Sequence, residues 1–130
     1  MTLPRTPSQT VGPFYSIGLC RRSDNQLDPS GVELRGRLTD GRADPIPDGM
    51  LEVWDAEARL WGRCETDAAG EYVFRVRADV AVLECHVFAR GLLRHERTRI
   101  PVAELARDST GLLRFDIAMQ GPTQTVFYET

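Results

Sequence analysis

Apolar and polar residues alternate along much of the chain, which is the period-two pattern of a strand with one buried face. In the segment VELRGRL, Val32, Leu34 and Leu38 fall on one face and charged residues fall on the other. The same alternation recurs in EYVFRVR (71–77), LECHVFA (83–89) and LLRFDIAM (112–119). Each of these segments is therefore predicted to be a strand that packs on one side against a core.

Three further segments predict short strands: MLEVWDA (50–56), RHERTRI (94–100) and QTVFYE (124–129). Turn-forming residues separate the strands in TDGRADPIPDG (39–49) and ARDSTG (106–111), and TDAAGEY (66–72) predicts a hairpin. Only PVAELAR (101–107) predicts a helix, of one or two turns. This pattern indicates an all-β fold, an antiparallel β-sandwich of about seven short strands.

Composition narrows the class of protein. The 130 residues are enough for one domain with a core of its own, and 42% hydrophobic and 27% charged residues are typical of globular proteins. A net charge of −3 gives no reason to expect nucleic acid or an anionic membrane as a partner. No apolar stretch has the length of a membrane span, and the N-terminal residues have no apolar segment typical of a signal peptide.

The cysteines and histidines offer little chemistry. Cys20, Cys64 and Cys85 are an odd number without zinc-binding spacing, which favours a reducing, cytoplasmic location. His86 and His95 are the only histidines, and neither has a neighbour at ligand spacing. No phosphate-binding loop, nucleophile elbow or zinc-binding helix motif occurs. From these residues we expect no metal ligand and no catalytic residue in this chain alone.

Five segments together resemble one enzyme family: TPSQTVGPFYSIGL (6–19), ELRGRLTDG with PDGMLEVWDA (33–56), WGRCETDAAGEYVFRV (61–76), VFARGLL (87–93) and RFDIAMQGPTQTVFYET (114–130). Their order and content are similar to the intradiol aromatic-ring dioxygenases, and within them to the alpha-type chains of the enzymes that cleave protocatechuate. The family fold is a β-sandwich, which is also what the alternation predicts.

The resemblance implies an iron-free alpha-type subunit of a hetero-oligomer. A homologous beta chain would hold the cofactor, Fe³⁺, through two tyrosines and a His-x-His pair, since ferric iron prefers anionic oxygen and imidazole donors. The implied substrates are a small aromatic acid, protocatechuate (3,4-dihydroxybenzoate), and O₂, and the product is 3-carboxy-cis,cis-muconate. The alpha chain would complete the substrate pocket of its partner.

The positions that correspond to the iron ligands support the alpha type. When the two sequences are registered on VFARG, the His-x-His positions fall on Val82 and Glu84. His86 would share the strand face of Glu84, and the pair is a weak candidate for a metal site. Tyr72 has the phase of a core residue. Compared with the family, the connections after Trp54, between 77 and 83 and between 99 and 112 are shortened.

The N-terminal segment 1–19 is predicted to be an arm that packs at the subunit interface and the pocket, followed by a sandwich domain over 20–130. Gly12 permits close backbone approach and Pro13 fixes the next φ, so that the turn is rigid. By resemblance, the residues that contact the substrate are Thr10, Gly12, Pro13, Phe14 and Arg90. From residue chemistry alone, the arm could equally be a staple that closes the sandwich, and Arg90 a surface residue.

Two other functions remain open at this point. One is a non-catalytic, transthyretin-like β-sandwich that binds a ligand or a protein partner. The other is a self-sufficient small dioxygenase that uses Glu84, His86 and a tyrosine.

Overall fold

The computed structural model describes residues 24–89, 96–120 and 124–127 of the chain. Within them lie eight strands and one short 3-10 helix: β1 (Val32–Thr39), β2 (Met50–Asp55), β3 (Leu60–Glu65), β4 (Glu71–Val76), β5 (Leu83–Phe88), β6 (Glu96–Ile100), η1 (Val102–Glu104), β7 (Leu113–Arg114) and β8 (Ile117–Ala118).

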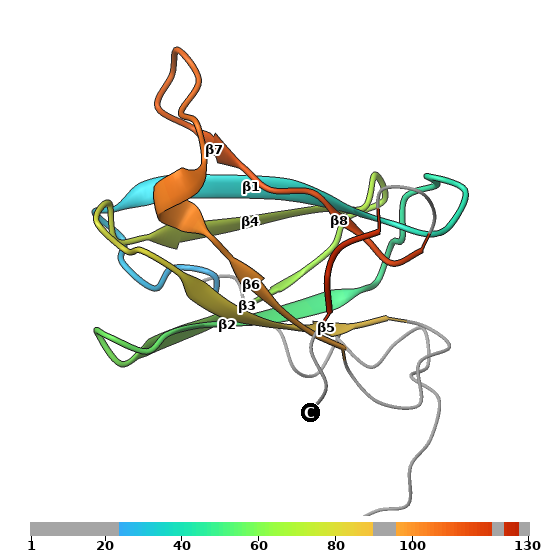
Figure 1. Ribbon diagram of the computed structural model, residues 1–130, viewed down its shortest axis with the longest axis horizontal. Coiled ribbons are helices and arrows are strands. Elements are labelled where there is room, and N and C mark those ends of the chain that lie inside the picture. Colours follow the sequence, from blue (N-terminus) through green and yellow to red (C-terminus); the bar gives the residue numbers. More distant parts are fainter. Residues whose placement is uncertain (1–23, 90–95, 121–123, 128–130) are drawn as a thin grey trace, which may run out of the picture.

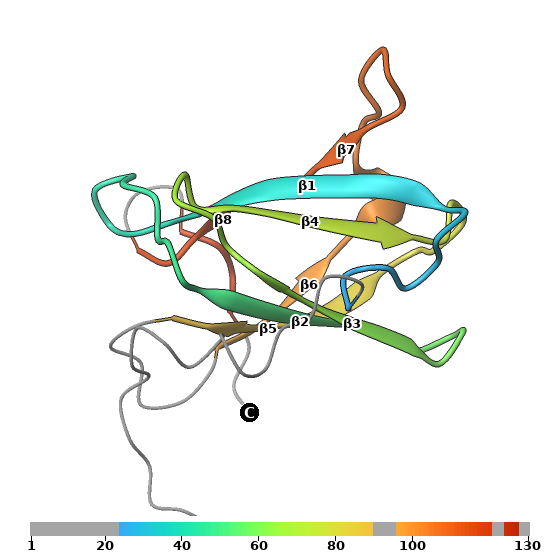
Figure 2. The ribbon, with the colours of Figure 1, turned by 180° about the vertical axis from the view of Figure 1, so that it is seen from behind.

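The strands form two sheets that pack face to face (Figure 1). In the upper layer the strand order is β4-β1-β7, with β8 also paired to β1, and in the lower layer it is β3-β2-β5-β6. Figure 2 shows the same two layers from behind. The all-β sandwich predicted from the alternation is confirmed, and the pairings of β1 with β4, β2 with β3 and β5, and β5 with β6 are antiparallel.

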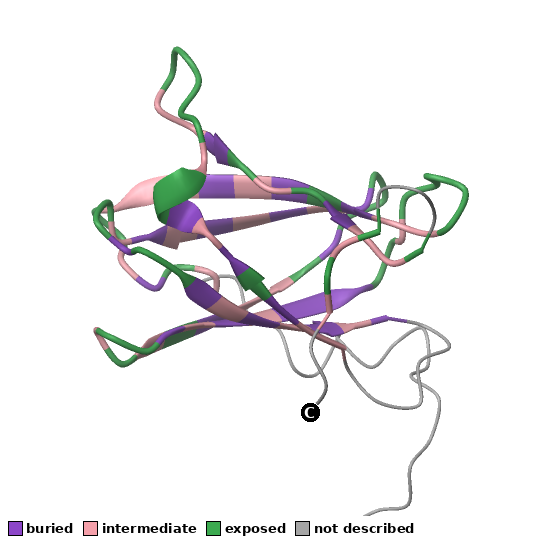
Figure 3. Ribbon diagram, viewed as in Figure 1, coloured by how far each residue is buried: buried purple, intermediate pink, exposed green. Residues whose placement is uncertain are grey.

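The core lies between the two layers, where the inward-facing strand residues are buried (Figure 3). The upper layer contributes Leu34 and Phe74, and the lower layer contributes Val53, Cys85 and Val87, all with no exposed surface. Each of the buried Leu, Phe and Val side chains stabilises the fold by roughly 1.5–3 kcal/mol relative to its exposed state. The phase predicted for 32–38, 71–77 and 83–89 is therefore confirmed, including the core positions of Tyr72 and Cys85.

The segment 112–119 differs from the single antiparallel strand predicted for it. It forms β7 and β8, two strands of two residues that run parallel to β1. Between them the chain stays beside β1 through other bonds: Phe115 N–H donates to the Arg35 carbonyl at 2.9 Å, and Arg37 N–H donates to Asp116 Oδ1 at 2.9 Å. At Gly36 an added Cβ would lie 1.8 Å from the Phe115 carbonyl oxygen, so this close approach depends on glycine.

The predicted hairpin over 66–72 has its tight turn, but the flanking strands lie in different sheets. Asp67 closes the turn, because its Oδ1 accepts hydrogen bonds from Ala69 N–H and Glu71 N–H, both at 2.9 Å. Beyond the turn, β4 pairs with β1, while β3 before it pairs with β2. The turn is a corner that carries the chain from the lower layer to the upper one.

Two other predictions concern the end of the chain. The helical turn predicted within 101–107 is confirmed as η1. The strand predicted over 124–129 is wrong within 124–127, which the structure describes without strand pairing. These residues are held instead by Thr125 N–H, which donates to the Ala118 carbonyl, and by the Val126 carbonyl, which accepts from Thr98 Oγ1. In the described parts of the chain, no helix has the length and apolarity to cross a membrane.

Candidate functional site

Strand register aligns two rows of polar and aromatic side chains across the outer face of the lower sheet. The first row runs through Trp61, Trp54, Glu84 and Arg99, on β3, β2, β5 and β6 in turn. The second row runs through Arg63, Glu52, His86 and Arg97. The residues between them on each strand point into the core, so alternation alone places these eight side chains on one surface.

Contacts within the two rows are dense. The rings of Trp54 and His86 lie 4.5 Å apart between centroids and are tilted by 57°. Arg63 lies over the Trp61 ring at 4.9 Å, and its Nε is 2.8 Å from Glu52 Oε1. Two of these three contacts combine an aromatic surface with a cation or a polar ring, so the outer face is amphipathic rather than merely charged.

A pocket of about 500 Å³ opens on this face, at the end where the 56–59 turn joins β2 to β3. Its lining includes Trp54, Leu60, Trp61, Glu84, His86 and Arg97. Its volume lies within the range of small-molecule sites, and aromatic walls with a few polar groups are typical of them. The sequence prediction named Glu84 and His86 as a weak pair but missed both tryptophans.

The described residues of this chain do not fit a ferric ion. Val82 is an exposed apolar residue without a donor atom, and Glu84 Oε1 is held 2.9 Å from Arg99 Nε in an ion pair. The ring of His86 is in tilted contact with the ring of Trp54. Within the described segments, no three His, Cys, Asp or Glu side chains are grouped closely enough to hold a metal ion.

Tyr72 is also unsuited to bind iron. Its side chain is 1% exposed, and its hydroxyl donates a hydrogen bond to the Phe115 carbonyl across the upper sheet. Burial raises the pKa of the Tyr72 phenol well above its ordinary value, so the tyrosinate form that iron requires is disfavoured. A ligand set that joins Glu84, His86 and this tyrosine is therefore not supported by the geometry.

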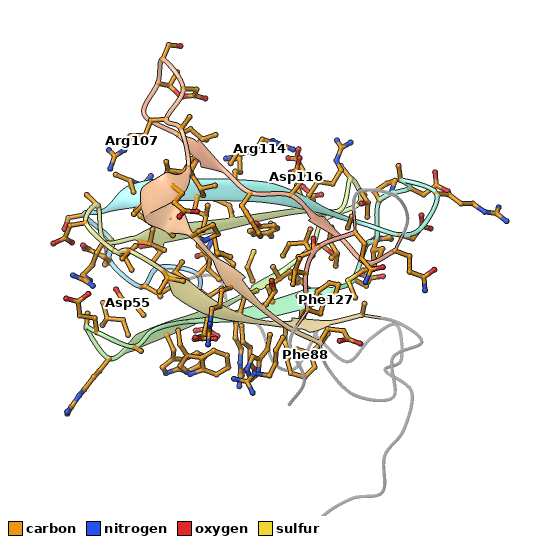
Figure 4. The ribbon with its side chains drawn as sticks, viewed as in Figure 1. Asp55, Phe88, Arg107, Arg114, Asp116 and Phe127 are labelled. Carbon is orange, nitrogen blue, oxygen red and sulfur yellow. The ribbon has the colours of Figure 1, made fainter. Side chains whose placement is uncertain are left out.

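The substrate contacts predicted by resemblance lie elsewhere in the chain. Thr10, Gly12, Pro13, Phe14 and Arg90 all fall outside the described residues, as does the arm at 1–19. Arg90 directly follows the described segment that ends at Ala89, and Phe88, the last residue of β5, lies on the outer face of the lower layer (Figure 4). The prediction that a strand ends just before Arg90 is confirmed, because β5 stops two residues earlier.

Comparison with known proteins gives relatives by sequence and by fold. The protocatechuate 3,4-dioxygenase alpha chain of Pseudomonas putida is 27% identical and covers 98% of this chain and 97% of its own length. The corresponding alpha chain of Burkholderia cepacia is 32% identical over 68% of this chain, which covers 47% of that relative. The crystal structure of 3-chlorocatechol 1,2-dioxygenase from Rhodococcus opacus 1CP matches with a TM-score of 0.57 at 15% identity, over 91% of this chain and 68% of that one. No family model matches the sequence.

The fold of the two packed sheets is that of the intradiol dioxygenases. Within that class, this chain is a homologue of the alpha chains of protocatechuate 3,4-dioxygenase. The alignment with the Pseudomonas putida chain runs over 195 positions although this chain has 130 residues, so the relative carries insertions that are absent here. The shortening predicted from the sequence is consistent with this difference, and the connection between β2 and β3 spans only residues 56–59.

Proposed function

We propose that this chain is an iron-free alpha-type subunit of an intradiol dioxygenase, which completes the substrate pocket of an iron-bearing beta-type partner. The observation that carries the proposal concerns two positions at the start of β5, a strand of an intradiol fold. Val82, just before the strand, and Glu84, within it, occupy the positions that resemblance assigns to the two histidine ligands, and Glu84 forms an ion pair with Arg99. A chain of this kind needs a partner for ring cleavage.

The proposed reaction is cleavage of protocatechuate with O₂ to 3-carboxy-cis,cis-muconate, in the cytoplasm. It is supported by the names of the sequence relatives, which are alpha chains of protocatechuate 3,4-dioxygenase. Fe³⁺ in the partner would activate the bound catecholate toward dioxygen. The contribution of this chain would be a wall of the pocket, formed by Thr10, Gly12, Pro13 and Phe14 of the arm and by Arg90 after β5.

Co-expression with an iron-bearing beta-type homologue tests the proposal. We expect the two chains to co-purify, and the complex to consume O₂ when protocatechuate is added. The chain expressed alone should contain no stoichiometric iron by metal analysis and should lack the visible absorption of tyrosinate bound to Fe³⁺. A coloured, iron-loaded single chain would overturn the alpha-type assignment. A soluble, iron-free chain that co-purifies with no beta-type homologue would favour a non-catalytic binding module instead.

The arm gives a second test, at the level of assembly. Residues 1–19 contain Val11, Phe14, Tyr15 and Ile17, and stable subunit interfaces bury apolar surface of this kind. We expect deletion of residues 1–19 to prevent co-purification with the beta-type chain while the β-sandwich still folds, as judged by circular dichroism. A truncated chain that still forms the complex would contradict the assignment of the arm to the interface.

A further inference from the structure

Three turns of the chain hold an aspartate carboxylate in the same way. In the turns that begin at Asp40, Asp67 and Asp108, the Oδ1 atom accepts hydrogen bonds from the N–H groups two and four residues further along, at 2.8–3.0 Å. In each turn the aspartate N–H also donates to the carbonyl of the residue four positions later. Each carboxylate is therefore fixed against the backbone that follows it.

The first of these turns differs from the other two in the position of its glycine. In the other two, alanine or serine follows the aspartate, and Gly70 and Gly111 occupy the position three residues after it, with φ values of 74° and 84°. After Asp40 the order is reversed, because Gly41 follows directly and Ala43 takes the left-handed position with a φ of 61°. Since Gly41 has no Cβ, its backbone nitrogen is the least hindered of the three that follow these aspartates.

The surroundings of Asp40 favour attack by that nitrogen on its carboxyl group. Gly41 is exposed, and its N–H donates no hydrogen bond within the described part of the chain. Attack on Asp40 Cγ places negative charge on Oδ1, where the N–H groups of Arg42 and Asp44 already bind at 2.8 and 3.0 Å. Donors fixed at the oxygen where charge develops lower the barrier to acyl transfer.

A second Asp-Gly pair, at Asp48, lies in the same connection between β1 and β2 but has the opposite environment. Gly49 is buried, and its N–H donates to Thr66 Oγ1 at 2.8 Å, which in turn donates to the Ile46 carbonyl at 2.7 Å. A buried, hydrogen-bonded nitrogen must lose that bond before it reacts, and local opening of this kind costs free energy. The connection thus contains the same dipeptide twice, once open and once protected.

We propose that Asp40 is a site of spontaneous covalent modification, at which the backbone isomerises to isoaspartate. First a bond forms between Gly41 N and Asp40 Cγ, and the Oδ2 hydroxyl of the protonated carboxyl leaves as water with the amide proton of Gly41. Water then opens the cyclic imide. Cleavage between Gly41 N and the main-chain carbonyl carbon of Asp40 gives isoaspartate, and cleavage of the new bond restores aspartate. No oxidant, reductant or cofactor is consumed.

The product has a backbone that is longer by one methylene group and bears a free carboxylate in the connection between β1 and β2. This connection lies at the end of the sandwich opposite the 56–59 turn (Figure 1). It shares no residue with the pocket on the outer face of the lower sheet, and the proposal is independent of the proposed role in ring cleavage. An enzyme that methylates isoaspartyl carboxylates is the kind of partner that would recognise the product.

Peptide mapping tests the proposal, because arginines separate the sites. Trypsin places the candidate aspartates Asp40, Asp48, Asp67 and Asp108 in different peptides, which are 38–42, 43–59, 64–75 and 108–114. The folded full chain is incubated at physiological temperature, and isoaspartate in each peptide is quantified by chromatography and by labelling with an isoaspartyl methyltransferase. It should accumulate in 38–42 about tenfold faster than in 43–59, the factor that corresponds to one net hydrogen bond.

Two controls separate the effect of the fold from that of the local sequence. In urea the two Asp-Gly pairs lose their different surroundings, so their peptides should accumulate isoaspartate at similar rates. In the folded chain, Gly41→Ala should reduce the rate at Asp40 to that at Asp67, which alanine also follows. The added Cβ would lie 3.1 Å from the exposed side chain of Gln120, which can move, so this variant should fold.

Thr66→Val tests the protection of the second pair. It removes the acceptor of the Gly49 N–H, and it should raise the rate at Asp48 about tenfold while the rate at Asp40 stays unchanged. Circular dichroism verifies that each variant is folded, and the comparison of the wild type with and without urea stands without any variant.

Three results would overturn the proposal. They are the absence of isoaspartate from peptide 38–42 of the folded chain, equal accumulation in 38–42 and 43–59 while the chain is folded, and a difference between these peptides that persists in urea. The last result would assign the difference to the local sequence and not to the fold. The measurement needs neither iron nor a partner chain, so its failure is distinct from failure of the proposed dioxygenase role.

Discussion

Asp55 and Arg77 join the two sheets through a bidentate ion pair. Asp55 ends β2 in the lower sheet and lies between the two layers (Figure 4), while Arg77 directly follows β4 in the upper sheet. Arg77 Nε is 2.6 Å from Asp55 Oδ2, and Nη2 is 3.0 Å from Oδ1. The same Oδ1 accepts a hydrogen bond from Ala58 N–H at 3.2 Å, which fixes the short turn between β2 and β3.

Loss of this pair should destabilise the fold. The Asp55 side chain is 1% exposed, so Asp55→Asn removes the buried partner of Arg77 and leaves it only the exposed carboxylates of Asp79 and Glu57. Breaking a buried ion pair on one side costs about 3–5 kcal/mol, and we expect urea unfolding to show a loss toward the lower end of that range, because Arg77 is partly solvated. The control is Glu33→Gln, which breaks the more exposed pair with Arg35 and should cost less than about 1 kcal/mol. Equal losses for the two variants would contradict this.

The same pair predicts a specific dependence of stability on pH. The hydrogen bonds from Arg77 hold the pKa of the Asp55 carboxyl below its usual value of 3.8, although burial opposes them. A carboxyl whose folded pKa is lowered stabilises the fold above its unfolded pKa, and that contribution is lost as the pH falls through the folded pKa. The difference in unfolding free energy between the wild type and Asp55→Asn should therefore be constant near neutral pH and should shrink below about pH 4. A difference that is unchanged down to pH 3 would exclude Asp55 as its source.

Tyr72 predicts the opposite dependence at alkaline pH. Burial raises the pKa of its phenol well above the ordinary 10.0, so its contribution to stability is complete below that value and is lost as the pH rises toward the folded pKa. In the folded protein the tyrosinate absorption should be the same for the wild type and Tyr72→Phe. In urea the wild type should show one additional titrating tyrosine. A difference between the two folded proteins near pH 10 would mean that Tyr72 ionises in place.

Substitution of Arg90 tests the proposed role of this chain in catalysis by the complex with a beta-type partner. A substrate carboxylate in a partly dry pocket needs a cationic partner, and resemblance assigns Arg90 to that wall. Arg90→Ala should lower kcat/KM for protocatechuate about ten- to a hundredfold, with iron retention unchanged, and should affect catechol much less because catechol lacks the carboxylate. Equal losses on the two substrates would remove Arg90 from the carboxylate, and no loss on either would make it a surface residue.

The sequence predicted which strand residues face the core better than it predicted which strands pair with one another. Alternation identifies which residues of β1, β4 and β5 are buried, because burial depends on phase alone. It cannot tell that the turn at Asp67 changes sheets, nor that 112–119 runs parallel to β1, because both depend on contacts distant in sequence. The segment around Phe115 and Asp116 shows this: its hydrogen bonds are to the Arg35 carbonyl and the Arg37 N–H of β1.

The candidate pocket could not be found from sequence for the same reason. Trp54 and Trp61 become neighbours only through the register that the 56–59 turn sets, and Arg97 joins them across two more strand pairings. One signal for the pocket was present in the sequence, although it could not show which residues become neighbours. Trp54 lies out of phase with the buried Leu51 and Val53, which places a large aromatic residue on the outer face of its strand.

The position of β1 in the upper sheet governs the order in which the chain can fold. β1 is the first strand of the described residues, yet it pairs on one side with β4 and on the other with β7 and β8. The bond between Arg37 N–H and Asp116 Oδ1 spans 79 residues. During synthesis on the ribosome, the upper sheet therefore stays incomplete until residues 113–118 have emerged. Closing such a long loop makes folding slow, on the order of milliseconds to seconds for β-sandwiches, and leaves one edge of β1 open to other chains in the meantime.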